Sequence, residues 1–160
     1  METDCPFCRI VRREQPARVV YEDEHVLAFF PRSPATLGHT LVIPKQHFAD
    51  IWTIGHEAAQ HVLQASLHIS QGLKASLQPE GLNMINSAGA AATQTVFHFH
   101  MHLVPRWQDD RIDDFWARGE FFADHVKEDV ADRVAAACAE LAPWAASAMT
   151  SARPTPSSIP

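Results

Sequence analysis

The segment QTVFHFHMHLVPRW, residues 94–107, places three histidines at every second position of an apolar run: His98, His100 and His102. Alternate side chains of a β-strand point to the same face of the sheet. The segment therefore predicts a strand with one face of imidazoles. Its opposite, apolar face is formed by Phe97, Phe99, Met101 and Leu103. A buried imidazole without a hydrogen-bonding partner costs free energy, so three in strict alternation indicate a polar site rather than an exposed sheet surface.

Apolar runs elsewhere in the chain predict four more strands. These are expected at residues 17–23, 25–31, 39–45 and 82–89. Each run is short and is bounded by turn residues, as strands of small sheets are. The first three are joined by connections too short for parallel crossovers, which favours antiparallel pairing.

Two segments have the periodicity of helices. Apolar and small residues recur at intervals of three and four over residues 56–77, and Gly81 follows as a stop signal. The predicted buried stripe of this helix is Ala59, Val62, Leu63, Ser66, Leu67, Ser70, Leu73 and Leu77. A second stripe predicts a helix over residues 126–141, before Pro143. Together with the strands, these helices predict an α+β domain with a mainly antiparallel five-stranded sheet and two main helices.

Length, charge and cysteine content restrict the class of protein. A chain of 160 residues suits one domain, which we assign to residues 1–142, and the remainder, residues 143–160, is expected to be a disordered tail containing Pro and Ser. The net charge of −6 argues against binding to a nucleic-acid backbone. We find neither a signal peptide nor an apolar stretch long enough for a membrane span, and three cysteines suit a reducing compartment. We therefore expect a cytoplasmic protein that binds neither nucleic acid nor membrane.

Clustered imidazoles suit two kinds of chemistry. In zinc hydrolases, two or three histidines hold the ion and leave one coordination position open. Alternatively, a neutral imidazole nitrogen attacks an electrophile such as phosphorus and forms a covalent intermediate. Histidine suits this second role because its neutral form is abundant near pH 7 and it leaves readily once protonated. The histidine pattern alone leaves both chemistries open.

The segment HFHMHLV resembles the His-φ-His-φ-His-φ-φ signature, with φ apolar, of the histidine-triad (HIT) family of nucleotide hydrolases and transferases. Four other segments match bacterial members of that family in order and spacing: CPFCRIVRRE, VYEDEHVLAFF, GHTLVIPKQH and GLNMINSAG. The resemblance covers residues 4–107 and implies a HIT-like fold and a homodimer. It also implies a small-molecule substrate of the AMP type and no organic cofactor.

The resemblance implies a role for each histidine of the site. His100 would be the nucleophile that attacks the α-phosphate of a nucleotide, forming a nucleotidyl-histidine that water then hydrolyses. His102 would hydrogen-bond the phosphate or the leaving group, and His39 would support the triad from a neighbouring strand. The residues implied to contact the phosphate region are Asn86, Gln94, Thr95 and His102. Those implied to wall the base pocket are Phe7, Ile10, Leu27, Phe29, Leu41 and Ile43.

The implied substrate is a nucleoside phosphoramidate or a related adenylate conjugate. A dinucleoside polyphosphate is the alternative substrate within the same class. Two other functions stay open at this point: a nucleotide-binding regulatory module with vestigial hydrolysis, and a zinc-dependent phosphoesterase.

Cys5 and Cys8 form a C-x-x-C motif, which is typical of zinc sites and of redox pairs. Some bacterial HIT proteins hold a structural zinc with such cysteines, and the matching ligand set here is Cys5, Cys8, His47 and His98. A closed set of two cysteines and two histidines leaves no open position on the metal, so this zinc would have a structural role. The three histidines would then divide between two functions.

Pro31 is a departure from the family pattern. At the end of the second strand, HIT proteins usually have an acidic or amide residue that binds the ribose hydroxyls. The proline here, in AFFPRSP, offers no polar side chain, so contacts to the ribose must come from the main chain or from neighbours such as Arg32 and Ser33. The departure bears on nucleoside preference.

Overall fold

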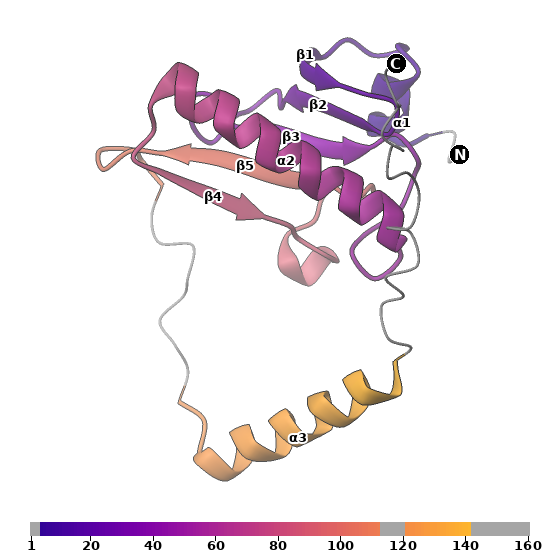
Figure 1. The fold of residues 1–160 in the computed structure, drawn as a ribbon, viewed down its shortest axis with the longest axis vertical. Coiled ribbons are helices and arrows are strands. Elements are labelled where there is room, and N and C mark those ends of the chain that lie inside the picture. The colour runs from indigo at the N-terminus through magenta and orange to yellow at the C-terminus, as the bar shows by residue number, and fades with distance from the viewer. Residues whose placement is uncertain (1–3, 113–120, 142–160) are drawn as a thin grey trace, which may run out of the picture. The chain divides into compact units, whose positions relative to one another are not determined.

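The computed structural model describes residues 4–112 and 121–141, and the chain divides into two compact units, residues 1–113 and 114–160. The elements of the first unit are α1 (Pro6–Val11), β1 (Arg18–Glu22), β2 (Val26–Phe30), β3 (Thr40–Pro44), α2 (His56–Leu77), β4 (Gly81–Ile85), the 3-10 helix η1 (Ala90–Ala92) and β5 (Met101–Arg106) (Figure 1). The second unit contains α3 (Asp124–Glu140).

The five strands form one sheet in the order β1-β2-β3-β5-β4, and every neighbouring pair is antiparallel. This confirms the predicted α+β architecture. The central pairing of β3 with β5 joins segments that are far apart in the sequence, with Leu41 opposite His102. It thereby places the start of β3 beside the histidine segment.

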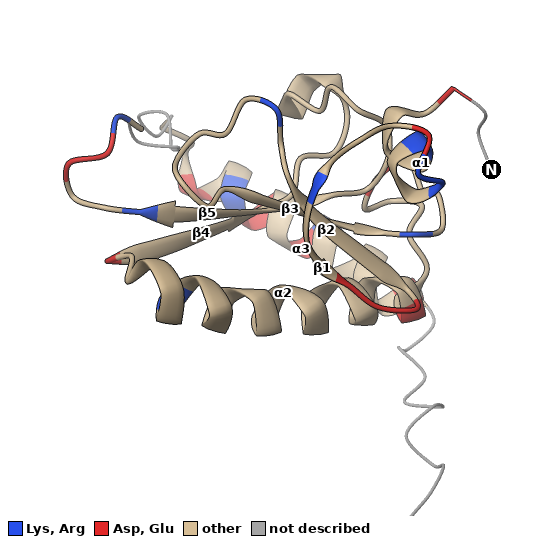
Figure 2. Cartoon of the chain, turned by 90° about the horizontal axis from the view of Figure 1, so that it is seen from above, with Lys and Arg blue, Asp and Glu red and all other residues tan. Residues whose placement is uncertain are grey.

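Apolar side chains cover both faces of the sheet. Figure 2 shows α2 on one side of the sheet and α1 with several loops on the other. The period-2 alternation of β2 and β3 supplies both layers. The buried residues on the α2 side are Val26, Ala28, Val42, Val62, Ala65, Ile69, Leu73, Phe99 and Leu103. Those on the α1 side are Cys5, Phe7, Cys8, Ile10, Leu27, Phe29, Leu41 and Ile43.

The histidine segment is not the continuous strand that its alternation predicts. β5 begins at Met101, and residues 94–100 lie outside the regular ladder. The alternation still sorts Phe99 and Leu103 to the α2 side, but Phe97 is 51% exposed and does not join them. The ladder starts late because the side chains and main chain of this segment make other hydrogen bonds, including one from the amide of Phe99 to the carbonyl of Phe48.

Two details of α2 differ from the prediction. The helix ends at Leu77 with Gln78 in the left-handed conformation, at φ 49°, so Gln78 rather than Gly81 terminates it, and Gly81 starts β4. In addition, Leu63 and Leu67 are half-exposed, because the helix buries the neighbouring face that carries Val62, Ala65, Ser66, Ile69 and Leu73.

The first and last described elements of the chain are both helices, α1 and α3. The sequence patterns did not predict α1, a six-residue helix that starts with Pro6 at its first position. The predicted helix over 126–141 is α3, whose apolar side chains are exposed within its own unit. The predicted tail at 143–160 lies outside the described residues. Among the described helices, none has the length and apolar character that a membrane crossing requires.

Candidate active site and metal centre

His100 lies just before β5, and only 5% of its surface is exposed. Its Nδ1 lies 2.7 Å from the main-chain oxygen of His98. A carbonyl oxygen only accepts, so Nδ1 carries the ring proton and donates it. In the neutral imidazole, the other nitrogen, Nε2, therefore keeps its lone pair. His100 is held in the tautomer that a nucleophilic attack through Nε2 requires.

Hydrogen bonds in series orient His102. The amide of Ala35 donates to Nδ1 of His39 over 3.0 Å, so the proton of a neutral His39 resides on Nε2. That nitrogen lies 2.9 Å from Nδ1 of His102, to which it donates. The proton of a neutral His102 is then on its own Nε2. The site consequently combines one unprotonated imidazole nitrogen, on His100, with one N–H donor, on His102.

Burial keeps these imidazoles neutral. It lowers the pKa of His102 from 6.5 to about 4, and the nearby His100 and His39 add to this shift. Burial also lowers the pKa of His39, again with a contribution from His100. For His100, burial lowers the pKa while the hydrogen bond to the carbonyl of His98 opposes the change. The charged form is disfavoured in each case because the surroundings solvate it poorly.

The three histidines His39, His100 and His102 line a cleft of about 760 Å³, a volume that suits a small organic ligand. Its apolar wall is formed by Phe7, Ile10, Phe29, Leu41 and Val96. The ring of Phe7 meets that of His100 edge-on, with centroids 5.4 Å apart. Leu27 and Ile43, which the resemblance assigned to the pocket wall, are fully buried in the core and do not line the cleft.

The residues predicted to contact phosphate differ in their surroundings. Thr95 is exposed and lines the cleft beside the histidines. The side-chain amide of Asn86 donates to the main-chain oxygen of His100 over 2.9 Å. Asn86 therefore fixes the backbone at His100. Its predicted contact with substrate stays a prediction.

Gln94 is 4% exposed, and its side chain binds the surrounding backbone. Nε2 donates to the carbonyls of Ala49 and Val96, at 2.7 and 3.1 Å, and Oε1 accepts from the amide of Gly89. A primary amide has two N–H donors, and both are in use here. The predicted contact of Gln94 with a phosphate oxygen would therefore require one of these bonds to break.

Cys5, Cys8, His47 and His98 form one cluster whose ligand atoms all lie within 4.8 Å of one another. Nε2 of His98 donates to the carbonyl of Pro44 over 2.9 Å, which leaves Nδ1 unprotonated in the neutral ring. This Nδ1 lies 3.5 Å from each cysteine sulfur and 3.3 Å from Nδ1 of His47. The four residues predicted as metal ligands are thus brought together.

The spacing of the cluster fits a tetrahedral metal ion. Bonds of about 2.3 Å to sulfur and about 2.0 Å to nitrogen give ligand-to-ligand edges of about 3.3–3.8 Å. The distances of 3.3–3.5 Å between the His98, His47 and cysteine ligand atoms fall in this range. Burial, together with the neighbouring Cys5, raises the pKa of the Cys8 thiol to about 11. A bound cation would reverse this preference, because it stabilises thiolates and releases their protons.

Two groups that support the site had no signal in the sequence. These are the carbonyl of Pro44 and the amide of Ala35, because backbone groups carry no sequence signal. Phe7 was expected in the pocket wall, but its edge-on contact with the ring of His100 was not.

Comparison with known proteins agrees with this geometry. A model of the HIT domain matches residues 12–109. Protein hit from Bacillus subtilis (strain 168) is 39% identical over 137 residues, which cover 86% of this chain and 93% of that protein. The chain therefore belongs to the HIT family.

Two further similar proteins are a zinc-bound protein and an enzyme. A crystal structure of a zinc-bound histidine triad family protein from Mycobacterium smegmatis is similar with a TM-score of 0.66 and 37% identity, covering 73% of this chain and 84% of that one. The adenylylsulfatase HINT3 of Arabidopsis thaliana is 32% identical over 117 residues, which cover 73% of this chain and 58% of that protein.

We predict that the stability of the protein falls as the pH drops below 6.5, in part because of His102. Burial lowers the pKa of this residue to about 4 in the folded state, from an ordinary value of 6.5. Between these values the unfolded chain binds a proton that the folded chain does not, so acid favours unfolding. Urea unfolding of the His102→Gln variant at several pH values between 7 and about 4.5 should show a weaker loss of stability than the wild type.

The matched control for this measurement is His68→Gln, because His68 is exposed on α2 and lies away from the triad. The loss of stability in acid should be weakened more by His102→Gln than by this control. Parallel curves for all three proteins would contradict the prediction.

Proposed function

We propose that this protein is a nucleotidyl hydrolase that acts at the α-phosphate of a nucleoside phosphoramidate or a related adenylate conjugate, through a nucleotidyl-histidine on His100. The observation that carries the proposal is the hydrogen bond from Nδ1 of His100 to the carbonyl of His98. It commits the ring proton to the side away from the reaction, so Nε2 is available as a nucleophile without prior deprotonation.

The neighbouring donor completes the chemistry. His102 presents an N–H at Nε2, because His39 binds its Nδ1. A neutral donor placed beside a phosphate stabilises the charge that builds on its oxygens, or assists departure of the leaving group. Thr95, exposed on the cleft wall, offers a hydroxyl for the same oxygens.

The reaction would run in two displacements. In the first, a bond forms between His100 Nε2 and phosphorus while the bond from phosphorus to the leaving nitrogen breaks, and that nitrogen takes up a proton from solvent and departs as the amine. In the second, water attacks phosphorus and gives its proton to solvent, and the electron pair of the breaking bond returns to Nε2, which releases the nucleotide and restores the imidazole. The net change is hydrolysis of the phosphoramidate.

The donor set of the metal cluster argues against the zinc phosphoesterase alternative. A metal held by two cysteines and two histidines has all four positions filled, so it has no place for substrate or water. The Arabidopsis relative is an adenylylsulfatase, and the adenylyl group in that activity supports an adenylate substrate here.

We expect adenosine 5′-phosphoramidate to leave one adenylyl group on His100. Rapid quenching in denaturant, followed by intact mass and peptide mapping, measures this adduct. The His100→Ala variant should lose the adduct, and its kcat/KM should fall by about 10⁴-fold or more, because the nucleophile is absent.

The control is His68→Ala, which removes an exposed histidine that does not line the cleft. Its turnover should match that of the wild type. Adenylylation of another residue, or turnover that survives in His100→Ala, would rule out the proposed nucleophile. Tight nucleotide binding with no hydrolysis by the wild type would favour the regulatory module.

We propose that the metal of the cluster is zinc and that its role is structural. Two cysteines and two histidines are the ligands that tetrahedral zinc prefers. The site would connect the N-terminal segment, through Cys5 and Cys8, to the sheet through His98. No step of the proposed reaction passes through the metal.

Metal analysis tests the zinc proposal. Protein purified without chelators should contain about one zinc per chain, and Cys8→Ser should contain far less, because a hydroxyl is a poor zinc ligand. Cys138→Ser is the matched control, since Cys138 lies exposed on α3, and it should keep its zinc. Equal zinc contents in the three proteins, or none in the wild type, would contradict the assignment.

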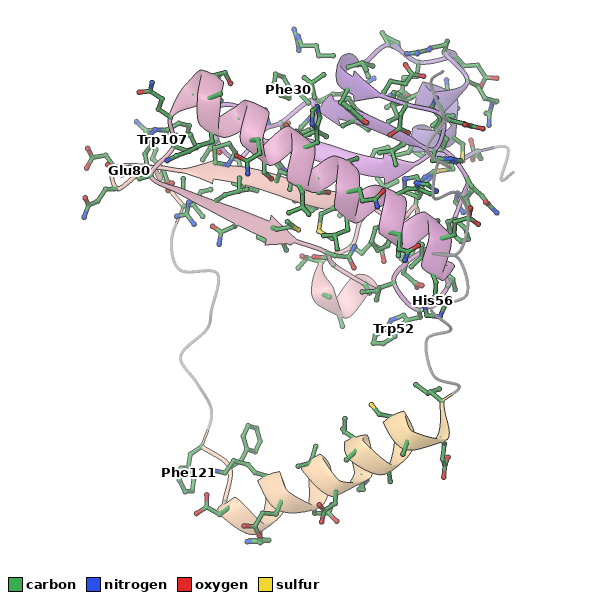
Figure 3. The ribbon with its side chains drawn as sticks, in the orientation of Figure 1. Phe30, Trp52, His56, Glu80, Trp107 and Phe121 are labelled. Carbon is green, nitrogen blue, oxygen red and sulfur yellow. The ribbon has the colours of Figure 1, made fainter. Side chains whose placement is uncertain are left out.

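We also propose a homodimer, as in the family. Exposed apolar side chains on two elements of the first unit support it: Leu63 and Leu67 on α2, and Leu82 and Met84 on the edge strand β4. An unpaired sheet edge with apolar side chains is a ready surface for a second copy. Trp52, in the loop before α2, is another exposed apolar side chain of this unit (Figure 3).

Light scattering after size exclusion should give twice the 17.8 kDa mass of the chain. Met84→Glu should shift the protein toward the single-chain mass, because it buries a charge at the proposed contact. Leu37→Glu changes an exposed leucine in the loop between β2 and β3 and should leave the mass unchanged. A wild type that elutes as a single chain would exclude the homodimer.

A further inference from the structure

The charges along the cleft are of one sign. Among the described residues that line it, there is no Asp or Glu, and the charged side chains are Arg18 and Arg32. This contrasts with the whole chain, whose 19 acidic residues outnumber its 13 Lys and Arg. Within the described part of the chain, neither arginine makes a hydrogen bond or ion pair through its side chain, in contrast to Arg13, which pairs with Glu22. Two guanidinium groups are therefore available to a ligand.

The two arginines come from neighbouring places in the fold. Arg18 begins β1 and lies opposite Phe30, the last residue of β2, and Arg32 follows Phe30 by two residues. The acidic residues of the same hairpin are at its other end, in the turn from Glu22 to Glu24. Figure 2 shows this separation, with acidic colour at the β1–β2 turn and basic colour without acidic colour on the loop from β2 to β3. The cleft end of the hairpin is thus positively charged.

Pro31 lies between Phe30 and Arg32 in the chain and also lines the cleft. A ribose hydroxyl both donates and accepts, and a carboxylate, which only accepts, can bind two free hydroxyls at once. The side chain of proline offers no such acceptor, and the two guanidinium groups, which only donate, match a charged phosphate better than they match hydroxyls. Nucleotide-binding folds of another kind use the same logic: an acidic residue selects the free ribose hydroxyl, and an arginine in its place accommodates a ribose phosphate.

We propose that the cleft selects nucleotides whose ribose carries a phosphate on its 2′ or 3′ hydroxyl, with Arg32 and Arg18 binding that phosphate. The inference rests on the proposed function, since it names the substrate class of the same site. The chemistry is that of paired arginines with a phosphate, where planar donors form short, charge-assisted hydrogen bonds. The 5′-phosphoryl group of the same nucleotide would lie at the histidines, which line the same cleft.

Three substrates test the proposal: adenosine 5′-phosphoramidate and its 2′-phosphate and 3′-phosphate derivatives. The wild type should hydrolyse one of the two derivatives with a kcat/KM at least about 10-fold above that of the unmodified compound, as expected for a charge-assisted contact. Arg32→Met and Arg18→Met should each reduce this preference ratio by about 10- to 100-fold. The better of the two derivatives identifies the hydroxyl that carries the phosphate.

Two further variants sharpen the result. Pro31→Asp should reverse the preference, because its carboxylate accepts from free hydroxyls and repels a phosphate. Arg9→Met is the matched control, since Arg9 is exposed on α1 and does not line the cleft, and it should leave the preference ratio unchanged. A wild type that prefers the unmodified compound, or a ratio that Arg32→Met does not alter, would overturn the proposal while the proposed function stands.

Binding of the products separates this proposal from the proposed function. Calorimetry should show tighter binding of adenosine 2′,5′-bisphosphate or adenosine 3′,5′-bisphosphate than of AMP, with a difference that Arg32→Met removes. That result would support the ribose-phosphate site even if none of the three phosphoramidates were hydrolysed, in which case only the proposed reaction would fail. Equal binding of AMP and both bisphosphates would overturn the ribose-phosphate site.

Discussion

Three groups of a single residue, His98, connect the histidine-lined cleft with the cluster of Cys5, Cys8, His47 and His98. Its Nε2 donates to the carbonyl of Pro44, its Nδ1 faces Cys5, Cys8 and His47, and its own carbonyl accepts from Nδ1 of His100. Because one residue supplies both the ring and the carbonyl, the position of His100, the proposed nucleophile, depends on the ring that faces Cys5, Cys8 and His47. A hydrogen bond to one ring nitrogen, such as that from His98 to Pro44, fixes both the tautomer and the orientation of a histidine.

The strand order of the sheet places the hydrogen-bonding partners of His98 and His102. β3 lies between β2 and β5, so it can supply Pro44 to His98 at one end and follow His39 at the other. His98 and His102 thus each find a partner on the same central strand or immediately before it. Burial then lowers the pKa of every imidazole of the triad, which keeps them neutral. Rigid placement and a neutral ring are the two conditions that nucleophilic attack by histidine needs.

The cleft is lined by neutral and by charged side chains at different places. Neutral imidazoles line it where the proposed chemistry occurs, and two arginines line it at the hairpin of β1 and β2. Apolar side chains such as Phe7 and Phe29 complete the wall, and the edge of Phe7 also packs against His100. The short helix α1 therefore contributes to both the cleft and the cluster, since it follows Cys5, contains Cys8 and carries Phe7 between them.

Local patterns in the sequence determined the five strands, the two main helices and the antiparallel α+β class, because period-2 and period-3.6 spacing reflect each residue's own neighbours. They did not predict the short helix α1. The C-x-x-C motif and the family resemblance also named the four residues, Cys5, Cys8, His47 and His98, that the structure brings together in a cluster able to hold a metal ion. Tertiary structure alone decided where β5 starts, that α2 turns Leu63 and Leu67 outward, and that the side-chain amide of Gln94 binds the backbone. These features depend on which distant group forms each hydrogen bond or covers each apolar surface. Examples are the carbonyl of Ala49, which accepts from Gln94, and the carbonyl of Pro44, which accepts from His98. Such competition between segments far apart in the chain leaves no local signal.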